Sequence, residues 1–224
     1  MKLLGKGLVS AALGLAAFGL MLFLPAGTFH YWQAWVFLGV FALSTWIPSI
    51  YLARTNPAAL ERRMRGGPLA ETRTLQRIVI TFLVICFLGM FVFSALDHRF
   101  GWSPVPTSIS VVGDILVAVG LSVAMLVVIQ NGYAAANVTV EASQQLASTG
   151  LYGLVRHPMY TGNIILMVGV PLALGSYWGL VFVIPGLIVL ALRIRDEEDL
   201  LEEELRGYRE YTQEVRYRLV PYVW

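Results

Sequence analysis

Long apolar stretches separated by short polar ones make up most of this chain. Four of them cover about residues 7–24, 31–52, 78–96 and 107–130, and each is near the roughly 20 residues that a helix needs to cross a bilayer. Two shorter apolar stretches follow at 160–174 and 178–192. Because backbone groups in lipid must be hydrogen-bonded internally, we expect helices throughout. The pattern predicts an all-α, polytopic integral membrane protein with about six hydrophobic helices, the last two forming a short hairpin.

The composition agrees with this class, since 57% of the residues are hydrophobic and 13% are charged. An ordinary soluble domain carries about twice that share of charge. The first apolar stretch follows Lys2 and Lys6 as in a signal peptide, but it lacks a small-x-small cleavage site, so we interpret it as a retained helix. The single cysteine, Cys86, lies within an apolar stretch and fits a small buried side chain.

The distribution of positive charge predicts the orientation in the membrane. With six helices and both ends inside, Arg99 alone of the 16 Lys and Arg residues falls outside. Because loops rich in Lys and Arg stay in the cytoplasm, we expect both termini and the charged C-terminal region on the cytoplasmic side. A basic loop at about residues 53–76 fits a topology signal that also contacts anionic head groups.

Two regions follow from this organisation. Residues 1–132 hold the N-terminal transmembrane helices and the basic loop, and residues 133–224 hold a candidate catalytic region. The second region contains Arg156-His157-Pro158, the hairpin, and a charged helix expected from Arg193 to Tyr211. Pro158 suits the first turn of a helix, so nearby amide groups are expected to be available to a ligand.

Two further features each allow a structural and a functional interpretation. Arg193 and Glu197 lie four residues apart on one helix face, which fits either an ordinary intrahelical ion pair or a site pair opposite Arg156-His157-Pro158. Asp114 is a carboxylate in an apolar stretch, and such a residue is either bonded within the fold or functional.

These residues form a pattern that resembles a known family. The pattern is Gly150-x-Tyr152-x-x-x-Arg156-His157-Pro158-x-Tyr160-x-Gly162, then Arg193-x-x-x-Glu197-Glu198-x-x-Leu201, then Tyr208-x-x-Tyr211-x-x-x-Val215 and Pro221. It resembles the isoprenylcysteine carboxyl methyltransferase family, which is related to membrane phospholipid methyltransferases, over roughly residues 137–221. In one departure, Leu205 stands where many relatives have glycine, and Gly207 adjoins Tyr208.

The resemblance implies S-adenosyl-L-methionine as the cofactor, bound between the hairpin and the C-terminal tail. Its family pattern implies catalytic roles for Arg193 and Glu197, and it assigns cofactor contacts to Leu151, Arg156, His157, Pro158, Tyr160 and Glu198. The glycine-rich strand-turn-helix fingerprint of a dinucleotide fold does not occur in the sequence. The histidines are three and widely separated, so we expect no metal centre, and the short basic loop does not favour nucleic acid.

The most favoured function is carboxyl O-methylation of a prenylcysteine-like or other hydrophobic acceptor, a lipid or lipidated molecule from the membrane. A carboxylate is ionised near neutral pH and needs orientation, which a planar guanidinium provides. N-methylation of a phospholipid amine is one alternative, and an NADPH-dependent membrane reductase of the steroid-reductase type is another. A transporter is disfavoured because the sequence shows no internal repeat or paired broken helices.

Overall fold

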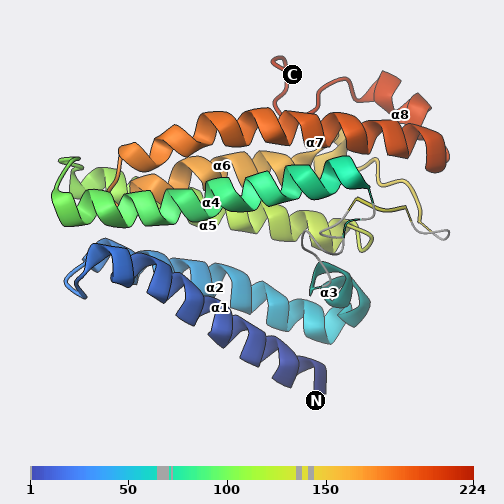
Figure 1. Ribbon diagram of the computed structural model, residues 1–224. Helices are drawn as coiled ribbons and strands as arrows, with labels where there is room; N and C mark the ends of the chain where they lie inside the picture. The colour runs from blue at the N-terminus through green and yellow to red at the C-terminus, as the bar shows by residue number, and fades with distance from the viewer. Residues whose placement is uncertain (1, 65–70, 72, 135–137, 141–143) are drawn as a thin grey trace.

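The structure, a computed structural model, describes residues 2–64, 71, 73–134, 138–140 and 144–224, with the side chains of residues 2–8 left aside. This described part is helical and contains no strand. Its α-helices, shown in Figure 1, are α1 (Lys2–Ala26), α2 (Trp32–Thr55), α3 (Pro57–Met64), α4 (Thr74–Phe100), α5 (Thr107–Gln130), α6 (Pro158–Ala173), α7 (Val183–Glu204) and α8 (Tyr208–Glu214). Two short 3-10 helices, η2 (Gly150–Gly153) and η3 (Trp178–Phe182), precede α6 and α7.

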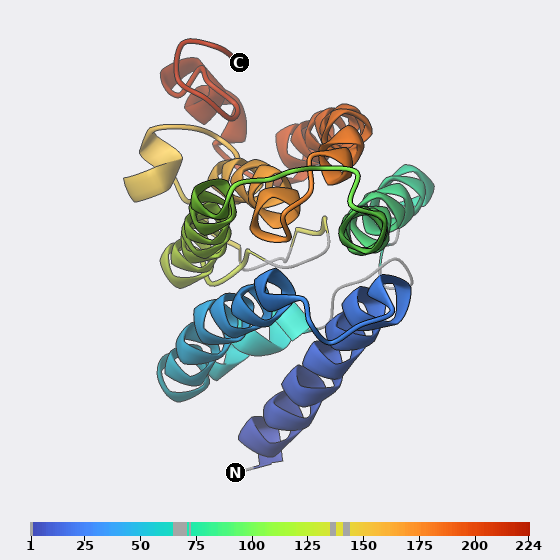
Figure 2. The same cartoon turned by 90° about the vertical axis from the view of Figure 1, so that its left-hand side faces the viewer.

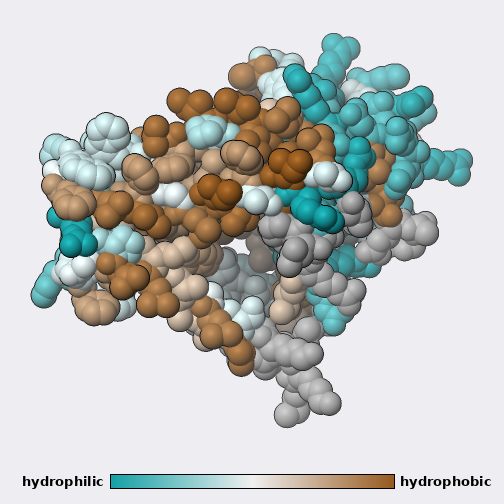
Figure 3. All heavy atoms as spheres, in the orientation of Figure 1, coloured by the Kyte–Doolittle hydropathy of each residue, from teal (hydrophilic) through white to brown (hydrophobic). Residues whose placement is uncertain are grey.

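The predicted polytopic membrane fold is confirmed. Five segments of the described chain are long and apolar enough to cross a membrane: α1, α2, α4, α5, and η3 together with α7. The shorter α6 is apolar as well, so the predicted short hairpin corresponds to α6 followed by η3 and α7. Apolar side chains cover the middle of the molecule in Figure 3, and the polar side chains gather mainly at the end that carries α8.

The prediction of a basic loop at residues 53–76 is partly wrong, because the structure places a helix inside this segment. Helix α3 occupies Pro57–Met64, and Gln76 already belongs to α4. Asn56 explains the start of α3, since its Oδ1 accepts a hydrogen bond of 3.1 Å from the amide of Ala59. A capping side chain followed by proline at the first helical position is a strong signal for a helix start.

The prediction of a single charged helix from Arg193 to Tyr211 is also wrong. Helix α7 runs without a break from the apolar part of the hairpin through the charged residues and ends at Glu204. Gly207 then adopts a φ of +85°, and α8 begins at Tyr208. Glycine enters this left-handed region without the steric cost that a side chain brings, so it redirects the chain here. The charged residues of α7 are therefore held on a rigid extension of a membrane helix.

Helices α5 and α6 approach closely because glycines line their contact. A Cβ atom at Gly120 of α5 would lie 2.6 Å from the carbonyl oxygen of Gly162 of α6. One at Gly113 would meet the amide nitrogen of Ala173 at 2.1 Å, and one at Gly169 would meet the amide nitrogen of Val117 at 2.9 Å. Small residues let membrane helices pack at short range, where dispersion forces are effective. This contact sets the position of α6, whose first turn carries Pro158 and Tyr160.

Helices α1 and α2 form a pair beside the other membrane helices, and Figure 2 shows α1 running away from them toward its N-terminus. The pair is attached at the end opposite α8. There Leu22, Tyr31 and Phe37 are fully buried in one core with Phe91 of α4. The hydroxyl of Tyr31 also donates a 2.6 Å hydrogen bond to the carbonyl oxygen of Leu174. At its other end α2 still packs on α5, where Leu52 and Val128 are buried in one cluster, whereas α1 diverges from the other helices (Figure 2).

We predict that Gly120→Ala destabilises the protein, because the added methyl group meets the backbone of α6. Overpacking of a tight contact typically costs about 1–3 kcal/mol, so the unfolding temperature in detergent should fall by several degrees. Gly39→Ala on α2 is the matched control, since a Cβ there has no atom within 4 Å. Equal unfolding temperatures for the two variants would contradict the close contact.

Candidate active site

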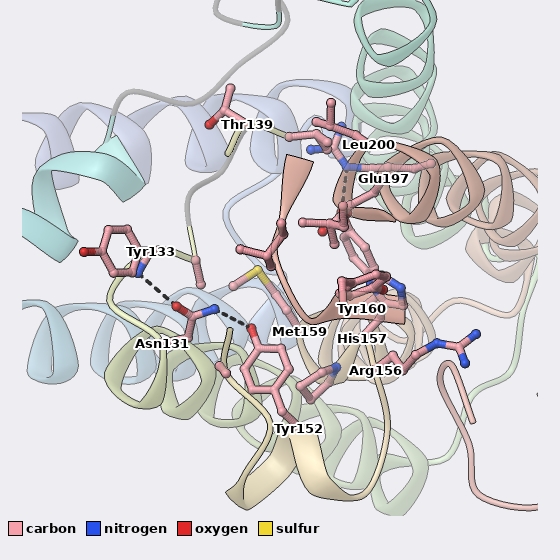
Figure 4. A pocket seen from close by; sticks show the side chains of 18 of the residues that line it. Asn131, Tyr133, Thr139, Tyr152, Arg156, His157, Met159, Tyr160, Glu197 and Leu200 are labelled. Carbon is pink, nitrogen blue, oxygen red and sulfur yellow. Dashed lines mark hydrogen bonds between the residues drawn. The ribbon is translucent and has the colours of Figure 1, made fainter. Parts of the chain in front are cut away.

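A cavity of about 470 Å³ lies at the polar end of the helices. Its walls come from α3, α4, the connection after α5, the first turn of α6, the charged part of α7, and α8. Figure 4 shows the labelled side chains of Tyr152, His157, Tyr160 and Glu197 around this space. The cavity thus joins Arg156-His157-Pro158 to Arg193 and Glu197, the two groups that the sequence analysis placed opposite each other.

The structure brings most of the predicted site residues to this cavity. Those that line it are Arg156, His157, Pro158, Tyr160, Arg193 and Glu197. The remaining two, Leu151 and Glu198, are not among its lining residues. The amide of Leu151 donates to Gln130 Oε1 at 3.2 Å, so this residue joins η2 to the end of α5. The role of each residue in binding stays a prediction.

Glu198 is a buried carboxylate that three cationic or polar side chains surround. Its Oε1 accepts from Arg156 Nε at 2.8 Å and lies 3.1 Å from His157 Nε2, while its Oε2 accepts from Arg218 Nε at 2.7 Å. Only 6% of Glu198 is exposed. A buried charge is tolerated when opposite charges and hydrogen bonds compensate it, as they do here. Glu198 therefore holds together α7, the start of α6 and the C-terminal tail.

The C-terminal tail occupies the backbone groups that were expected to receive a ligand. The amide of Arg156 donates to Tyr217 O and that of His157 donates to Arg218 O, both at 2.9 Å. Thr161 Oγ1 adds a 2.8 Å bond to Leu219 O. The expectation that amides beside Pro158 are available is wrong for these two, because the tail pairs with them. These amides fasten the tail across the start of α6.

A second network surrounds Arg193. Its Nε donates to the hydroxyl of Tyr160 at 2.9 Å, and its Nη1 donates to Glu71 Oε1 at 3.0 Å and to Gln76 Oε1 at 2.9 Å. The hydroxyl of Tyr160 donates in turn to Glu197 Oε2. Tyr160 thus bridges the Arg193 and Glu197 side chains, so the two predicted catalytic residues act as part of one bonded cluster.

The N-terminal half of the chain contributes residues that sequence reasoning missed. Glu71 and Gln76 are 2% and 0% exposed, and both bind Arg193. Arg73 pairs with Asp196 of α7 at 2.6 Å, and Gln76 Nε2 donates to the same carboxylate at 2.5 Å. The one signal in the sequence is a glutamine in the first turn of a strongly apolar helix. The partner of this glutamine depends on which helix packs opposite it, and the sequence alone does not show which helix that is.

Tyrosines form another wall of the cavity. Tyr211 donates to the carbonyl oxygen of Tyr152 at 2.6 Å, and the Tyr152 hydroxyl accepts from Asn131 at 3.2 Å (Figure 4). The hydroxyl of Tyr208 is buried and has no hydrogen-bond partner among the described residues. Burial raises the pKa of Tyr208, and the charges of Glu198 and Glu197 raise it further. The phenol therefore stays protonated and keeps an unused O–H donor.

Asp114 lies apart from this site. It is a buried residue of α5 and does not line the cavity, and neither of its carboxylate oxygens has a partner among the described residues. Among all the residues that the structure describes, no group of three or more His, Cys, Asp or Glu residues is arranged to hold a metal ion.

Comparison with known proteins confirms the resemblance seen in the sequence. Residues 109–206 match the family model described as phospholipid methyltransferase. The matched segment begins in α5 and extends past the end of α7, so it includes all the predicted site residues from Leu151 to Glu198. The match supports a membrane methyltransferase.

A curated relative belongs to another enzyme class. The chain is 38% identical over 88 residues to the Delta(14)-sterol reductase of Mus musculus. The similar segment covers 36% of this chain and 20% of that protein. This chain therefore matches about a fifth of the length of the reductase, which leaves most of that protein without a counterpart in the comparison.

We predict that Glu198→Gln loosens the C-terminal tail. The amide cannot balance the charges of Arg156 and Arg218, and breaking a buried ion pair on one side costs about 3–5 kcal/mol. Thermal unfolding should shift to lower temperature, and protease should cleave the tail after residue 214 faster. Glu203→Gln, at an exposed position of the same helix, is the control. An intact, protease-resistant tail in Glu198→Gln would rule out this anchoring role.

Proposed function

We propose that this chain, whose residues 109–206 match the phospholipid methyltransferase family, is an integral membrane methyltransferase that uses S-adenosyl-L-methionine. We propose further that it methylates the carboxylate of a hydrophobic, prenylcysteine-like acceptor. The observation that carries the proposal is the bonded cluster of Tyr160, Arg193 and Glu197, which lines a cavity at the polar end of membrane helices.

The cavity fits the proposed cofactor. Its volume lies within the range of about 300–1,000 Å³ that is common for small-molecule sites. The unpartnered hydroxyl of Tyr208 would gain a hydrogen bond from a polar ligand. Tyrosine faces and the carboxylate of Glu197 suit a ligand that carries a positive charge. His157, Tyr160 and Tyr208 are the residues proposed to hold it.

When bound, S-adenosyl-L-methionine supplies a methyl group whose bond to the sulfonium sulfur breaks, with the electron pair left on sulfur, as a carboxylate oxygen takes the methyl. A carboxylate is already ionised near neutral pH, so the protein need not remove a proton. Its main task is alignment of the reacting groups. Arg193 is the residue proposed to align the acceptor carboxylate, because Glu71, Gln76 and Tyr160 hold its guanidinium in one position.

The charges on the cavity wall favour a carboxylate over an amine acceptor. Three guanidinium groups, Arg63, Arg156 and Arg193, line the cavity. Arg156 pairs with Glu198 and Arg193 pairs with Glu71, so repulsion of a positively charged amine would come mainly from Arg63. Should the acceptor be a lipid amine, Glu197 is the carboxylate placed to accept its proton. We further propose that the site faces the cytoplasm, because that orientation leaves Arg99 as the one basic residue outside.

The reductase remains a second candidate because of the 38% identity to a sterol reductase. An enzyme of that kind would bind a nicotinamide dinucleotide in place of S-adenosyl-L-methionine. The two candidates therefore differ in a ligand that is measured directly.

We predict that the detergent-purified protein binds S-adenosylhomocysteine in calorimetric titration and does not bind NADPH. Tyr208→Phe should weaken this binding by about three- to tenfold, since one hydrogen bond contributes about 0.5–1.5 kcal/mol. The same variant should be at least as stable as the parent, because it removes a buried hydroxyl that has no partner in the described structure.

Tyr177→Phe is the control for this titration, since Tyr177 is exposed and does not line the cavity. Binding of NADPH without S-adenosylhomocysteine would replace the methyltransferase proposal by the reductase.

We predict that Arg193→Lys lowers methyl transfer at least about tenfold while S-adenosylhomocysteine still binds within about twofold, since lysine cannot reproduce the planar fork that orients a carboxylate. The assay follows labelled methyl from S-adenosyl-L-methionine into a membrane lipid extract. Arg195→Lys is the control, because Arg195 is an exposed residue of α7 two positions after Arg193. Undiminished transfer in Arg193→Lys would remove the proposed role of Arg193.

A further inference from the structure

A second cavity, of about 510 Å³, lies between the N-terminal helices. Side chains of α1, α2 and α3 line it, among them Leu15, Phe18, Phe41, Trp46 and Leu60. We call this cavity the α1–α2 groove. It lies in the part of the molecule where α1 runs away from the other helices (Figures 1 and 2), so its walls come largely from membrane-spanning segments.

The α1–α2 groove is effectively apolar, although hydroxyl groups occur in its wall. Thr45 Oγ1 donates to Phe41 O at 2.8 Å, and Ser49 Oγ donates to Thr45 O at 2.6 Å. These two hydroxyls are therefore satisfied by the backbone of their own helix, and Ser10, the third hydroxyl residue of the wall, is exposed. A hydrocarbon chain is the ligand that such a wall accepts without leaving polar groups unpaired.

Arg63 connects this groove with the candidate active site. It is the one described residue that lines both cavities. Its Nη1 lies 3.3 Å from the sulfur of Met159, which belongs to the wall of the active-site cavity. An amphiphile in the groove would thus meet a positive charge at the point where the groove adjoins the active site.

The charge of Arg63 has no carboxylate partner among the described residues. By contrast, Arg193 binds Glu71, Arg156 binds Glu198 and Arg73 binds Asp196. Burial lowers the pKa of Arg63; the neighbouring Tyr160 raises it and the charge of Arg193 lowers it again. Arg63 is half-buried, and a partly desolvated guanidinium without a carboxylate partner is stabilised when an anion binds to it.

We propose that Arg63 binds the carboxylate of the methyl acceptor and that the α1–α2 groove holds the acceptor's single hydrocarbon chain. The inference rests on the proposed methyltransferase function and specifies its substrate: a long-chain carboxylic acid. A guanidinium forms strong, planar contacts with a carboxylate. Methylation turns this anion into a neutral ester, so Arg63 retains the substrate and loses its attraction for the product.

The test uses full-length protein in phosphatidylcholine nanodiscs at alkaline pH, with dibrominated stearate and its methyl ester as probes. Bromine quenches tryptophan fluorescence at short range, and Trp46 lines the groove. The difference between the parent protein and Trp46→Phe isolates the signal of Trp46. We expect saturable quenching of Trp46 at lower concentrations of the acid than of the ester.

Variants of Arg63 test the role of its charge. Arg63→Gln should weaken quenching by the acid about tenfold, since a charged hydrogen bond contributes about 1.5–3 kcal/mol, and should leave quenching by the ester unchanged. Arg63→Lys should restore part of the preference. Arg54→Gln, an exposed arginine of α2 that lines neither cavity, should behave like the parent.

Two results would overturn the inference: equal quenching by acid and ester in the parent protein, or acid quenching that Arg63→Gln leaves unchanged. Stronger quenching by a brominated phosphatidylcholine than by the acid would also overturn it, because the groove would then be a phospholipid site. Titration of the same samples with S-adenosylhomocysteine shows that the variants are folded. It also tests the proposed function separately, since cofactor binding without an acid preference would contradict the present inference alone.

Discussion

The buried carboxylate of Glu198 is the contact on which the candidate site depends most. A charge with 6% exposure at the end of a membrane helix needs compensation, and Arg156, His157 and Arg218 provide it from two other segments. Satisfying one charge therefore brings the start of α6, the end of α7 and the C-terminal tail together. The tail then pairs with the backbone of residues 156 and 157, which line the cavity.

The second network, around Arg193, joins residues from the N-terminal and C-terminal halves of the chain. The segment that matches the methyltransferase family begins at residue 109, yet Arg193 is held by Glu71 and Gln76, which precede it. Arg63, which adjoins the α1–α2 groove, also lies outside the matched segment. Conserved chemistry can be placed on a scaffold whose remaining parts select the substrate. In this molecule the residues before 109 and after 206 lie outside the matched segment, and both parts supply walls of the cavity, among them Arg63, Tyr208 and Tyr211.

The arrangement of the two cavities supports the proposed reaction between a polar cofactor and a lipid. One cavity lies among charged residues at the polar end of the molecule, and the other lies among apolar side chains of membrane helices. Arg63 lines both, so an anion placed there would be near each. The close glycine contact of α5 and α6 sets the position of Pro158 and Tyr160 at the start of α6, and attachment of α1 and α2 at the far end leaves the groove beside α3.

The sequence alone determined the class of the protein, and its family resemblance predicted a set of site residues. The length of its apolar stretches predicts membrane helices because lipid offers no partner to the backbone, and the bounds of α5 agree with the predicted stretch at 107–130. The family resemblance assigned site roles to Arg156, His157, Tyr160, Arg193 and Glu197, and the structure places these five residues around one cavity, while their roles stay predictions. Tertiary structure decided the partners of these residues: Glu71 and Gln76 for Arg193, and the C-terminal tail for the amides beside Pro158. Periodicity reports which residues share a helix face, whereas pairing across helices depends on their packing, which arises from contacts between residues far apart in the chain.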